Sequence, residues 1–539
     1  MRQIHSANRE WVTISVILIW ALCVCYYNIS VSPVETDEAL YAAVGRQIAR
    51  TSQWFRLEYE RAPFLYKPPL HFWLMAISMR LWGETELGVR FPSATFGLAT
   101  IFLVYFAGKA FFQRRVAVTA TLSTATTYNI FWLAPQGKMD VELGFWMNLA
   151  VLSFLLAYRE EERRSGFLVL SFFSMTMATM LKGPVGTLLP GFAAFVYLVS
   201  TRRSGAVKEI PAFGFGLLAL LGIAGAYYLA LTPEFNRYFF VVENLMRITE
   251  ESRPLLFYFY MIFPDLFPWS LFVPGAAVAL WRSGLLRPGT HEFSVLVWFL
   301  SFLLFLSIPS YKEEDFLVYL LPPFALLMAR SWAQLWPPWG TSTTLPVSLL
   351  KGSLILLILG MFAALLIGPK ILQLRFPGFP DLIGPAHSIV AGLVLVCLVA
   401  LYIALQRQIR DVFYAVAVIA LTLTLAFVHF FRAAQGQYNA VKNIARDIRS
   451  TVGDSPLALS PTQGSTELLY YLDRTEPVWY VAKIDGVEKF WRSEKKVFAL
   501  LTTDLYDELK SLPGFPTHKV AEFAHRKWHY VLIHTTEPR

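Results

Sequence analysis

The stretch WVTISVILIWALCVCYYNIS, residues 11–30, decides the class of fold. It contains no charged residue, and about 20 apolar residues are what an α-helix needs to cross the hydrocarbon core of a bilayer. A cleaved signal peptide is the alternative interpretation. The stretch is longer than the apolar region of a signal peptide and lacks a small-x-small cleavage site, so we expect a transmembrane helix here.

The rest of the chain has the same apolar character. Of its 539 residues, 55% are hydrophobic, 16% aromatic and only 16% charged, and its mean hydropathy is +0.47. This composition is too apolar for an ordinary soluble domain and is typical of a polytopic membrane protein. The three cysteines, Cys23, Cys25 and Cys397, lie in apolar segments, where we expect packing roles rather than disulfides or a metal cluster.

Apolar runs predict a polytopic α-helical protein with about thirteen membrane-spanning helices. The runs begin near residues 11, 91, 117, 142, 166, 184, 211, 258, 293, 316, 346, 386 and 412. The loops after the even-numbered spans are short and basic, which places them and the N-terminus in the cytoplasm. This sidedness also explains the net charge of +9, so we expect no nucleic-acid partner. The first external loop is then 31–90.

The tail after residue 432 mixes charged residues with short apolar runs. SPLALS, PVWYVA and KKVFALLT are typical of strands, whereas STELLYYLD and DLYDELKSL are typical of helices. This alternation predicts a small α/β unit on the external side. The predicted organisation is therefore a transmembrane domain over 1–432 and a soluble extracytoplasmic α/β domain over 433–539.

Ionisable residues are rare inside the predicted spans and gather at their external ends. Such groups are costly in the hydrocarbon core and are usually functional. A transporter should carry polar groups near the middle of its path, whereas this distribution indicates a reaction site at one membrane face. The residues concerned are Asp37, Glu38, Lys67, Lys138, Asp140, Lys182, Arg247, Arg253, Asp265 and the run Lys312 to Asp315.

ETDEALYAAVGRQIA, residues 35–49, predicts a short amphipathic helix lying in the membrane interface. Leu40, Val44 and Ile48 recur every four residues, and Arg46 falls on the polar side. Asp37 has two interpretations on pattern alone. It either caps this helix and favours the positive end of its dipole, or serves a reaction.

The other polar motifs also admit structural interpretations. In YKPPLHFWL, residues 66–74, two prolines suit a helix start and Lys67 could extend to the lipid headgroups. His71 fits an interfacial packing residue better than a metal ligand. Lys138 and Asp140 precede a span and could cap it, and Lys182 lies in the tight turn LKGPVG, residues 181–186. All of these groups share the predicted external side.

The motifs TDEALY, YKPPLHFWL, KMD, LKGPVG and ENLMR…FPWS, in this order over roughly residues 10–335, resemble a known group of enzymes. These are the polyprenyl-phosphate-sugar transferases of the aminoarabinose transferase and protein O-mannosyltransferase superfamily. The resemblance implies a membrane-embedded GT-C fold in a bacterial inner membrane, with a periplasmic C-terminal domain. It implies Asp37 as the catalytic carboxylate, Asp140 as a second acidic site residue and Lys67 as a ligand of the lipid phosphate.

Arg247 and Arg253 are the candidates to close over that phosphate. Further site candidates are Glu38, Tyr66, His71, Lys138, Lys182 and Lys312. No metal site is predicted, although the use of a divalent metal is left open. Two positions depart from the aminoarabinose transferase pattern: Leu40 stands where an arginine is expected, and Tyr66 where a glutamate is expected.

The predicted function is the inverting transfer of a sugar from a polyprenyl-phosphate donor to an envelope acceptor at the external membrane face. The acceptor is lipid A, another glycolipid or polysaccharide, or a protein Ser/Thr. A transporter or flippase of a lipid-linked substrate is the main alternative. A non-catalytic envelope assembly protein is the third. The expected partners are the donor, the lipid or glycan acceptor, and the membrane lipids.

Overall fold

The computed structural model describes most of the chain. The described residues are 2–27, 29–202, 253–334, 344–375, 412–422, 441–462, 465–474, 478–491, 497–511, 518–525 and 528–534, with isolated positions between 222 and 239 and between 391 and 402. They form two compact units. A helical unit comprises Met1–Tyr27, Leu65–His71 and Arg90–Phe430, and a mixed unit comprises Asn28–Phe64, Phe72–Val89 and Phe431–Arg539.

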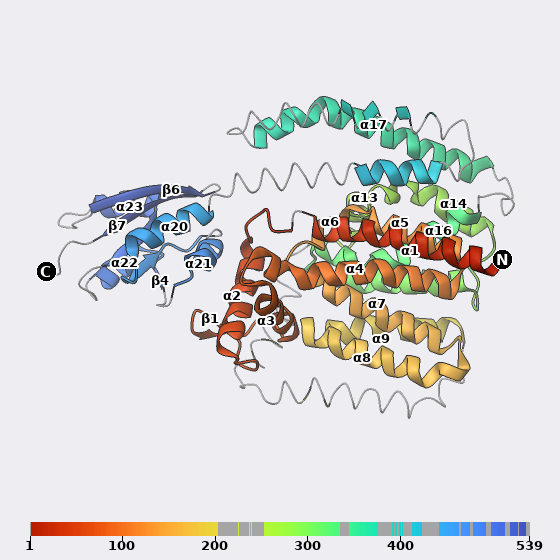
Figure 1. Ribbon diagram of the computed structural model, residues 1–539, viewed down its shortest axis with the longest axis horizontal. Coiled ribbons are helices and arrows are strands. Elements are labelled where there is room, and N and C mark those ends of the chain that lie inside the picture. The colour runs from red at the N-terminus through yellow and green to blue at the C-terminus, as the bar shows by residue number, and fades with distance from the viewer. Residues whose placement is uncertain are drawn as a thin grey trace. The chain divides into compact units, whose positions relative to one another are not determined.

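The helical unit is built from apolar helices. Its helices, of which α4 begins in the mixed unit, are α1 (Arg2–Tyr26), α4 (Glu86–Phe111), α5 (Arg114–Ala125), α6 (Tyr128–Leu133), α7 (Asp140–Ala157), α8 (Arg164–Lys182), α9 (Val185–Ser200), α13 (Phe257–Asp265), α14 (Val273–Arg282), α15 (His291–Ser307), α16 (Leu321–Gln334) and α17 (Thr344–Arg375). Short 3₁₀ segments are η1 (Glu161–Arg163), η4 (Trp269–Phe272) and η5 (Glu314–Leu320). Helices α7, α8 and α9 pack side by side (Figure 1).

Four helices of the described residues are long and apolar enough to cross a membrane. They are Glu86–Phe111, Asp140–Ala157, Glu161–Lys182 and Glu314–Gln334, and a bent pair, Phe257–Asp265 with Trp269–Arg282, makes up to five. Shorter apolar helices start near five of the other predicted spans, at Ile14, Val185, His291, Ser348 and Val412. The predicted class, a helical membrane protein, is confirmed. The number thirteen stays a prediction, because the spans expected near residues 211 and 386 lie largely outside the described residues.

The mixed unit contains a five-stranded sheet. Its strands are β3 (Leu457–Leu459), β4 (Trp479–Tyr480), β5 (Phe498–Thr502), β6 (His518–His525) and β7 (Trp528–His534), in the order β4-β3-β5-β7-β6. Strands β3, β4 and β5 pair in parallel, whereas β7 pairs antiparallel with both β5 and β6. The three strands and two helices predicted from the tail are all present.

Helices cover both faces of this sheet because side chains alternate along each strand. Leu457, Leu459 and Leu500 point to the face covered by α20 (Val441–Val452) and α21 (Ser465–Leu472). Ala458 and Leu501 point to the face covered by α22 (Ile484–Trp491) and α23 (Thr503–Lys510).

The mixed unit also contains most of the predicted first external loop. That part consists of α2 (Thr36–Thr51), the hairpin β1 (Glu58–Tyr59) and β2 (Ala62–Pro63), and nearly all of α3 (Leu70–Trp82). The sequence does not predict this combination of loop and tail. The expected boundary between residues 432 and 433 stays a prediction.

Candidate active site

Helix α2 forms where the four-residue apolar spacing predicts it, but its apolar face is covered by protein. Val44 and Ile48 are fully buried and pack with Phe72 and Ala76 of α3. The apolar face of α2 therefore packs on α3, a contact that the spacing within α2 alone does not reveal. The expected position of this helix in the membrane interface stays a prediction.

The start of α2 is capped by Glu35 and Glu38, not by Asp37. Glu35 is the N-cap residue and its N–H donates to Glu38 Oε2 at 3.2 Å, which forms a capping box. Glu38 is buried in this role. Asp37 is exposed in the first turn, and among the described residues its carboxylate has no partner. Its charge favours the helix dipole, but the carboxylate is available for other chemistry.

A buried ionic cluster lies at the start of α7 in the helical unit. Lys182, the last residue of α8, donates to Asp140 Oδ1 at 2.6 Å. The hydroxyl of Tyr319 donates to the same oxygen. The side chains of Asp140 and Lys182 are only 8% and 17% exposed, so each charge depends on the other for its compensation.

Aromatic rings complete the surroundings of this pair. The Lys182 ammonium lies 4.1 Å from the centre of the Phe316 ring, a cation–π contact. Phe316 in turn stacks on Tyr319, with ring centres 5.7 Å apart. Segment η5 therefore supplies both a hydrogen-bond donor for Asp140 and an aromatic face for Lys182.

His71, in the first turn of α3, is fully buried against Glu142 in the first turn of α7. Its Nδ1 lies 3.0 Å from Glu142 Oε2, and both side chains are at most 1% exposed. The expected interfacial packing role of His71 is therefore wrong, because the histidine pairs with a carboxylate 71 positions away. Among the residues that the structure describes, no three His, Cys, Asp or Glu side chains are grouped so as to hold a metal ion.

Three further predicted cations have defined places. Lys138 donates to Asp315 Oδ2 at 2.7 Å. Lys312 is buried and donates to the backbone carbonyl of Arg253 at 3.3 Å. The Arg253 guanidinium is exposed and lies 5.2 Å from the Phe257 ring centre. Arg247 lies outside the described residues.

Tyr66 and Lys67 lie in the segment directly before α3. Tyr66 is exposed and Lys67 is half-buried, and the buried pair Pro68 and Pro69 precedes the first helical residue, Leu70. This agrees with the expectation that the two prolines mark a helix start.

The structure thus places three of the predicted site residues beside η5 and its neighbours. Lys138 pairs with Asp315 of η5, and Lys182 pairs with Asp140 and contacts Phe316 of η5. Sequence reasoning did not identify Tyr319 as a site residue. A tyrosine inside an apolar run carries no signal of its own. Its role becomes visible only once η5 is packed against α7.

The fold is of the membrane-embedded GT-C type. The crystal structure of ArnT from Cupriavidus metallidurans bound to undecaprenyl phosphate is similar with a TM-score of 0.80, over 97% of this chain and 98% of that chain, at 22% identity. The oligosaccharyltransferase AglB from Archaeoglobus fulgidus is similar with a TM-score of 0.53, over 92% and 70% of the two chains, at 14% identity.

Sequence comparisons agree with this class. A family model described as dolichyl-phosphate-mannose-protein mannosyltransferase matches residues 66–228. The undecaprenyl phosphate-alpha-4-amino-4-deoxy-L-arabinose arabinosyl transferase of Aeromonas hydrophila is 27% identical over 307 residues, 55% of each chain. That of Yersinia pestis is 26% identical over 306 residues, 55% of this chain and 54% of the relative.

The chain thus spans about half the length of the curated relatives it matches. The resemblance to the aminoarabinose transferase and O-mannosyltransferase superfamily is confirmed.

Proposed function

We propose that this protein is an inverting glycosyltransferase of a bacterial inner membrane. It transfers a sugar from a polyprenyl-phosphate donor to an envelope acceptor at the external face. We propose thirteen spans, a cytoplasmic N-terminus and a periplasmic C-terminal domain. The fold of this chain and the names of its relatives support the donor class.

The observation that carries the proposal is where the ionisable side chains lie along the long apolar helices. In the four long spans, every Asp, Glu, Lys and Arg lies within the first or last five residues. Asp140 and Lys182 illustrate this, since one begins α7 and the other ends α8. A transporter needs ionisable groups near the middle of its path, and the four long spans have no Asp, Glu, Lys or Arg there.

The proposed reaction exchanges one bond at the anomeric carbon for another and transfers one proton. The acceptor hydroxyl attacks the anomeric carbon opposite the phosphate, the bond from that carbon to the phosphate oxygen breaks, and polyprenyl phosphate departs with the electron pair. Asp37 accepts the hydroxyl proton, a role supported by its carboxylate, which is exposed and has no partner among the described residues. Lys67, with Arg247 or Arg253, stabilises the negative charge that develops on the departing phosphate.

Asp140 has a different role in this proposal. Its Oδ1 already accepts from Lys182 and Tyr319, so it suits the fixing of a cation better than proton transfer. We propose that Asp140 holds Lys182 in place beside η5, and that His71 with Glu142 fixes the first turn of α7.

The proposal covers more than one sugar and more than one class of acceptor. The relatives are named for 4-amino-4-deoxy-L-arabinose, but Leu40 and Tyr66 stand where that group is expected to carry an arginine and a glutamate. Lipid A, another glycolipid or polysaccharide, and protein Ser/Thr are the acceptor classes to compare.

The test is a substrate panel. Purified protein is incubated with a set of polyprenyl-phosphate sugars and envelope acceptors, and products are analysed by mass spectrometry. A glycosyltransferase yields an acceptor heavier by one sugar residue together with free polyprenyl phosphate. Movement of an intact lipid-linked sugar across a vesicle membrane, without a new glycosidic bond, would instead support the flippase alternative.

A further inference from the structure

The start of α2 is bonded to a helix more than 400 residues away in the chain. The backbone N–H and the hydroxyl of Thr36 both donate to Glu467 Oε1, at 3.0 and 3.2 Å. Glu467 belongs to α21 and is fully buried. The first N–H groups of a helix have no partner within the helix. This carboxylate therefore satisfies one of them at the residue directly before Asp37.

A second bond from α21 holds the chain just before the helix. The Val34 N–H donates to the hydroxyl of Tyr471 at 2.8 Å, and that hydroxyl donates to Glu86 Oε1 at 2.7 Å. Val34 is itself fully buried. The backbone on the N-terminal side of Asp37 is thus tied to α21 at two positions, Val34 and Thr36.

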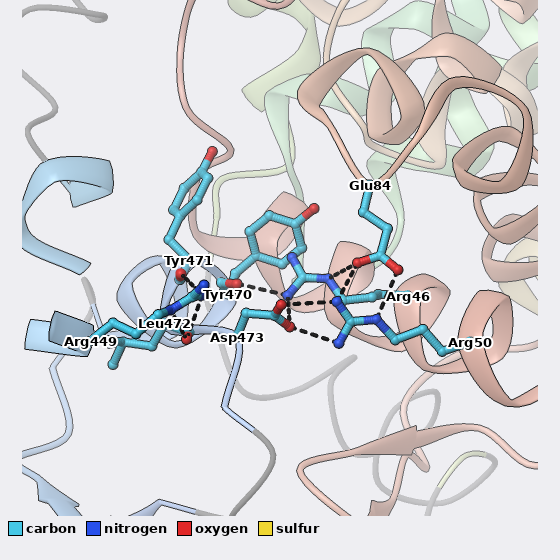
Figure 2. A network of polar contacts seen from close by, with 8 residues as sticks. All are labelled: Arg46, Arg50, Glu84, Arg449, Tyr470, Tyr471, Leu472 and Asp473. Carbon is cyan, nitrogen blue, oxygen red and sulfur yellow. Dashed lines mark hydrogen bonds and ion pairs between the residues drawn. The ribbon is translucent and has the colours of Figure 1, made fainter. Parts of the chain in front are cut away.

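The C-terminal half of α2 is held by an ionic network at the end of α21 (Figure 2). Arg46 donates to the Tyr470 carbonyl at 2.9 Å and to Asp473 Oδ1 at 2.8 Å. Its guanidinium lies 3.7 Å from the centre of the Tyr470 ring. Arg50 bonds both carboxylate oxygens of Asp473 at 2.9 Å, and also Glu84.

The Asp473 carboxylate is ionised in this network. Burial alone would raise the pKa of Asp473, but the hydrogen bond from Arg50 and the charge of Arg46 outweigh burial and lower the pKa below its ordinary value. The network holds Arg46, Arg50, Glu84 and Asp473 together by ion pairs. Networks of this kind fix geometry better than isolated surface pairs.

We infer that α21 of the C-terminal segment positions Asp37 for the transfer reaction, with Glu467 as the positioning residue. The inference rests on the proposed function. Asp37 is exposed, so the place of its carboxylate depends on the backbone that carries it. That backbone is bonded by Glu467 and Tyr471 at its start and by Asp473 further along α2. The C-terminal segment thereby has a role in the reaction without touching substrate.

The expected effect follows from how sharply catalysis depends on geometry. A displacement of about 1 Å in a reacting group can cost about 10²-fold in rate. Glu467→Ala removes the acceptor for both Thr36 donors, and we expect kcat to fall by about tenfold to a hundredfold with the donor KM changed by less than about twofold. Glu467→Gln keeps an Oε1 acceptor and should restore most of kcat.

The control is Val487→Ala in the cluster on the other face of the sheet. Val487 is fully buried and packs with β5 and β7 side chains, not with α2. This variant reports loss of stability in the C-terminal segment alone. Activity is expressed per folded molecule, measured by size-exclusion chromatography of the full chain in detergent.

Hydrogen–deuterium exchange of the 34–40 amides gives a readout independent of activity. We expect faster exchange there in Glu467→Ala, and wild-type exchange in Glu467→Gln and Val487→Ala. Wild-type kcat and exchange in Glu467→Ala would overturn the inference, as would equal losses in the Ala and Gln variants. If the wild-type protein transfers no sugar, the proposed function fails, and the exchange result still decides whether α21 holds this backbone.

Discussion

Replacing Lys182 with methionine tests whether the Asp140 cluster is held together by charge compensation. The change keeps an unbranched side chain beside Phe316 and removes the ammonium. Asp140 is then a buried carboxylate whose remaining described donor is Tyr319. In the wild type, Lys182 Nζ lies 2.6 Å from Asp140 Oδ1 and the two side chains are 17% and 8% exposed.

The magnitude follows from this burial. Removing one partner of a buried pair leaves an uncompensated charge and costs about 3–5 kcal/mol of stability. Asp140→Asn should cost less, because its amide oxygen can still accept from Lys182 and Tyr319. The double variant Lys182→Met/Asp140→Asn removes both charges, so we expect it to be more stable than Lys182→Met alone. The coupling energy should be about 1–3 kcal/mol.

The assay is the fraction of detergent-solubilised protein that remains monodisperse after heating, measured for the four members of this double-mutant cycle. The pair Arg330 and Glu292 is the matched control. Its atoms also lie 2.6 Å apart and its side chains are 25% and 7% exposed. Arg330→Met should lower stability like Lys182→Met, yet leave transfer per folded molecule at the wild-type level.

Two results would refute this reasoning. Lys182→Met could be as stable as the wild type, which would mean that Asp140 does not need the ammonium. Alternatively, the double variant could be as unstable as Lys182→Met, which would mean that the loss comes from packing against Phe316 rather than from charge.

Two further predictions concern the turn between α8 and α9 and the network at the end of α21. Gly186→Ala would place a Cβ 2.3 Å from the Ala178 carbonyl carbon. We expect this substitution to cost about 1–3 kcal/mol of folding stability. Gly191→Ala is the control, because its Cβ would meet nothing within 4 Å, and it should keep wild-type stability. Equal thermal unfolding temperatures for the two variants would contradict this prediction.

The pKa of Asp473 is lowered from 3.8 in the folded protein. The ionised carboxylate therefore contributes to folding stability above about pH 4, and this stability is lost as the pH falls through the lowered pKa. The hydrogen–deuterium exchange rate of the α2 amides, corrected for intrinsic rates, should therefore rise on acidification. A corrected rate that does not change with pH would contradict a role of ionised Asp473 in holding α2.

The sequence predicts the elements that depend on local patterns. Helices α4, α7 and α8 follow from apolar runs long enough to span a bilayer, and α2 follows from the four-residue spacing of Leu40, Val44 and Ile48. Helix α20 was missed although its pattern was available. Val441, Ile444, Ala445, Ile448 and Val452 are all buried at helical spacing.

The contacts of the site could not be predicted because they join distant parts of the chain. Lys182 and Asp140 were identified as external polar residues, but that they bind each other depends on how α7 and α8 pack. The same holds for Thr36 and Glu467, which are 431 positions apart. The capping box of Glu35 and Glu38 is a local feature, in contrast to these long-range contacts.

The central claim is that Asp37 serves the transfer of a sugar from polyprenyl phosphate. The most direct test measures, in proteoliposomes, the polyprenyl phosphate released and the glycosidic bond formed, for wild type and Asp37→Asn. Because Asp37 is exposed without a partner among the described residues, the variant should fold normally. We predict one bond per phosphate released in the wild type and a loss of about 10²- to 10⁴-fold in the variant. Near-normal turnover in correctly folded Asp37→Asn would contradict the account.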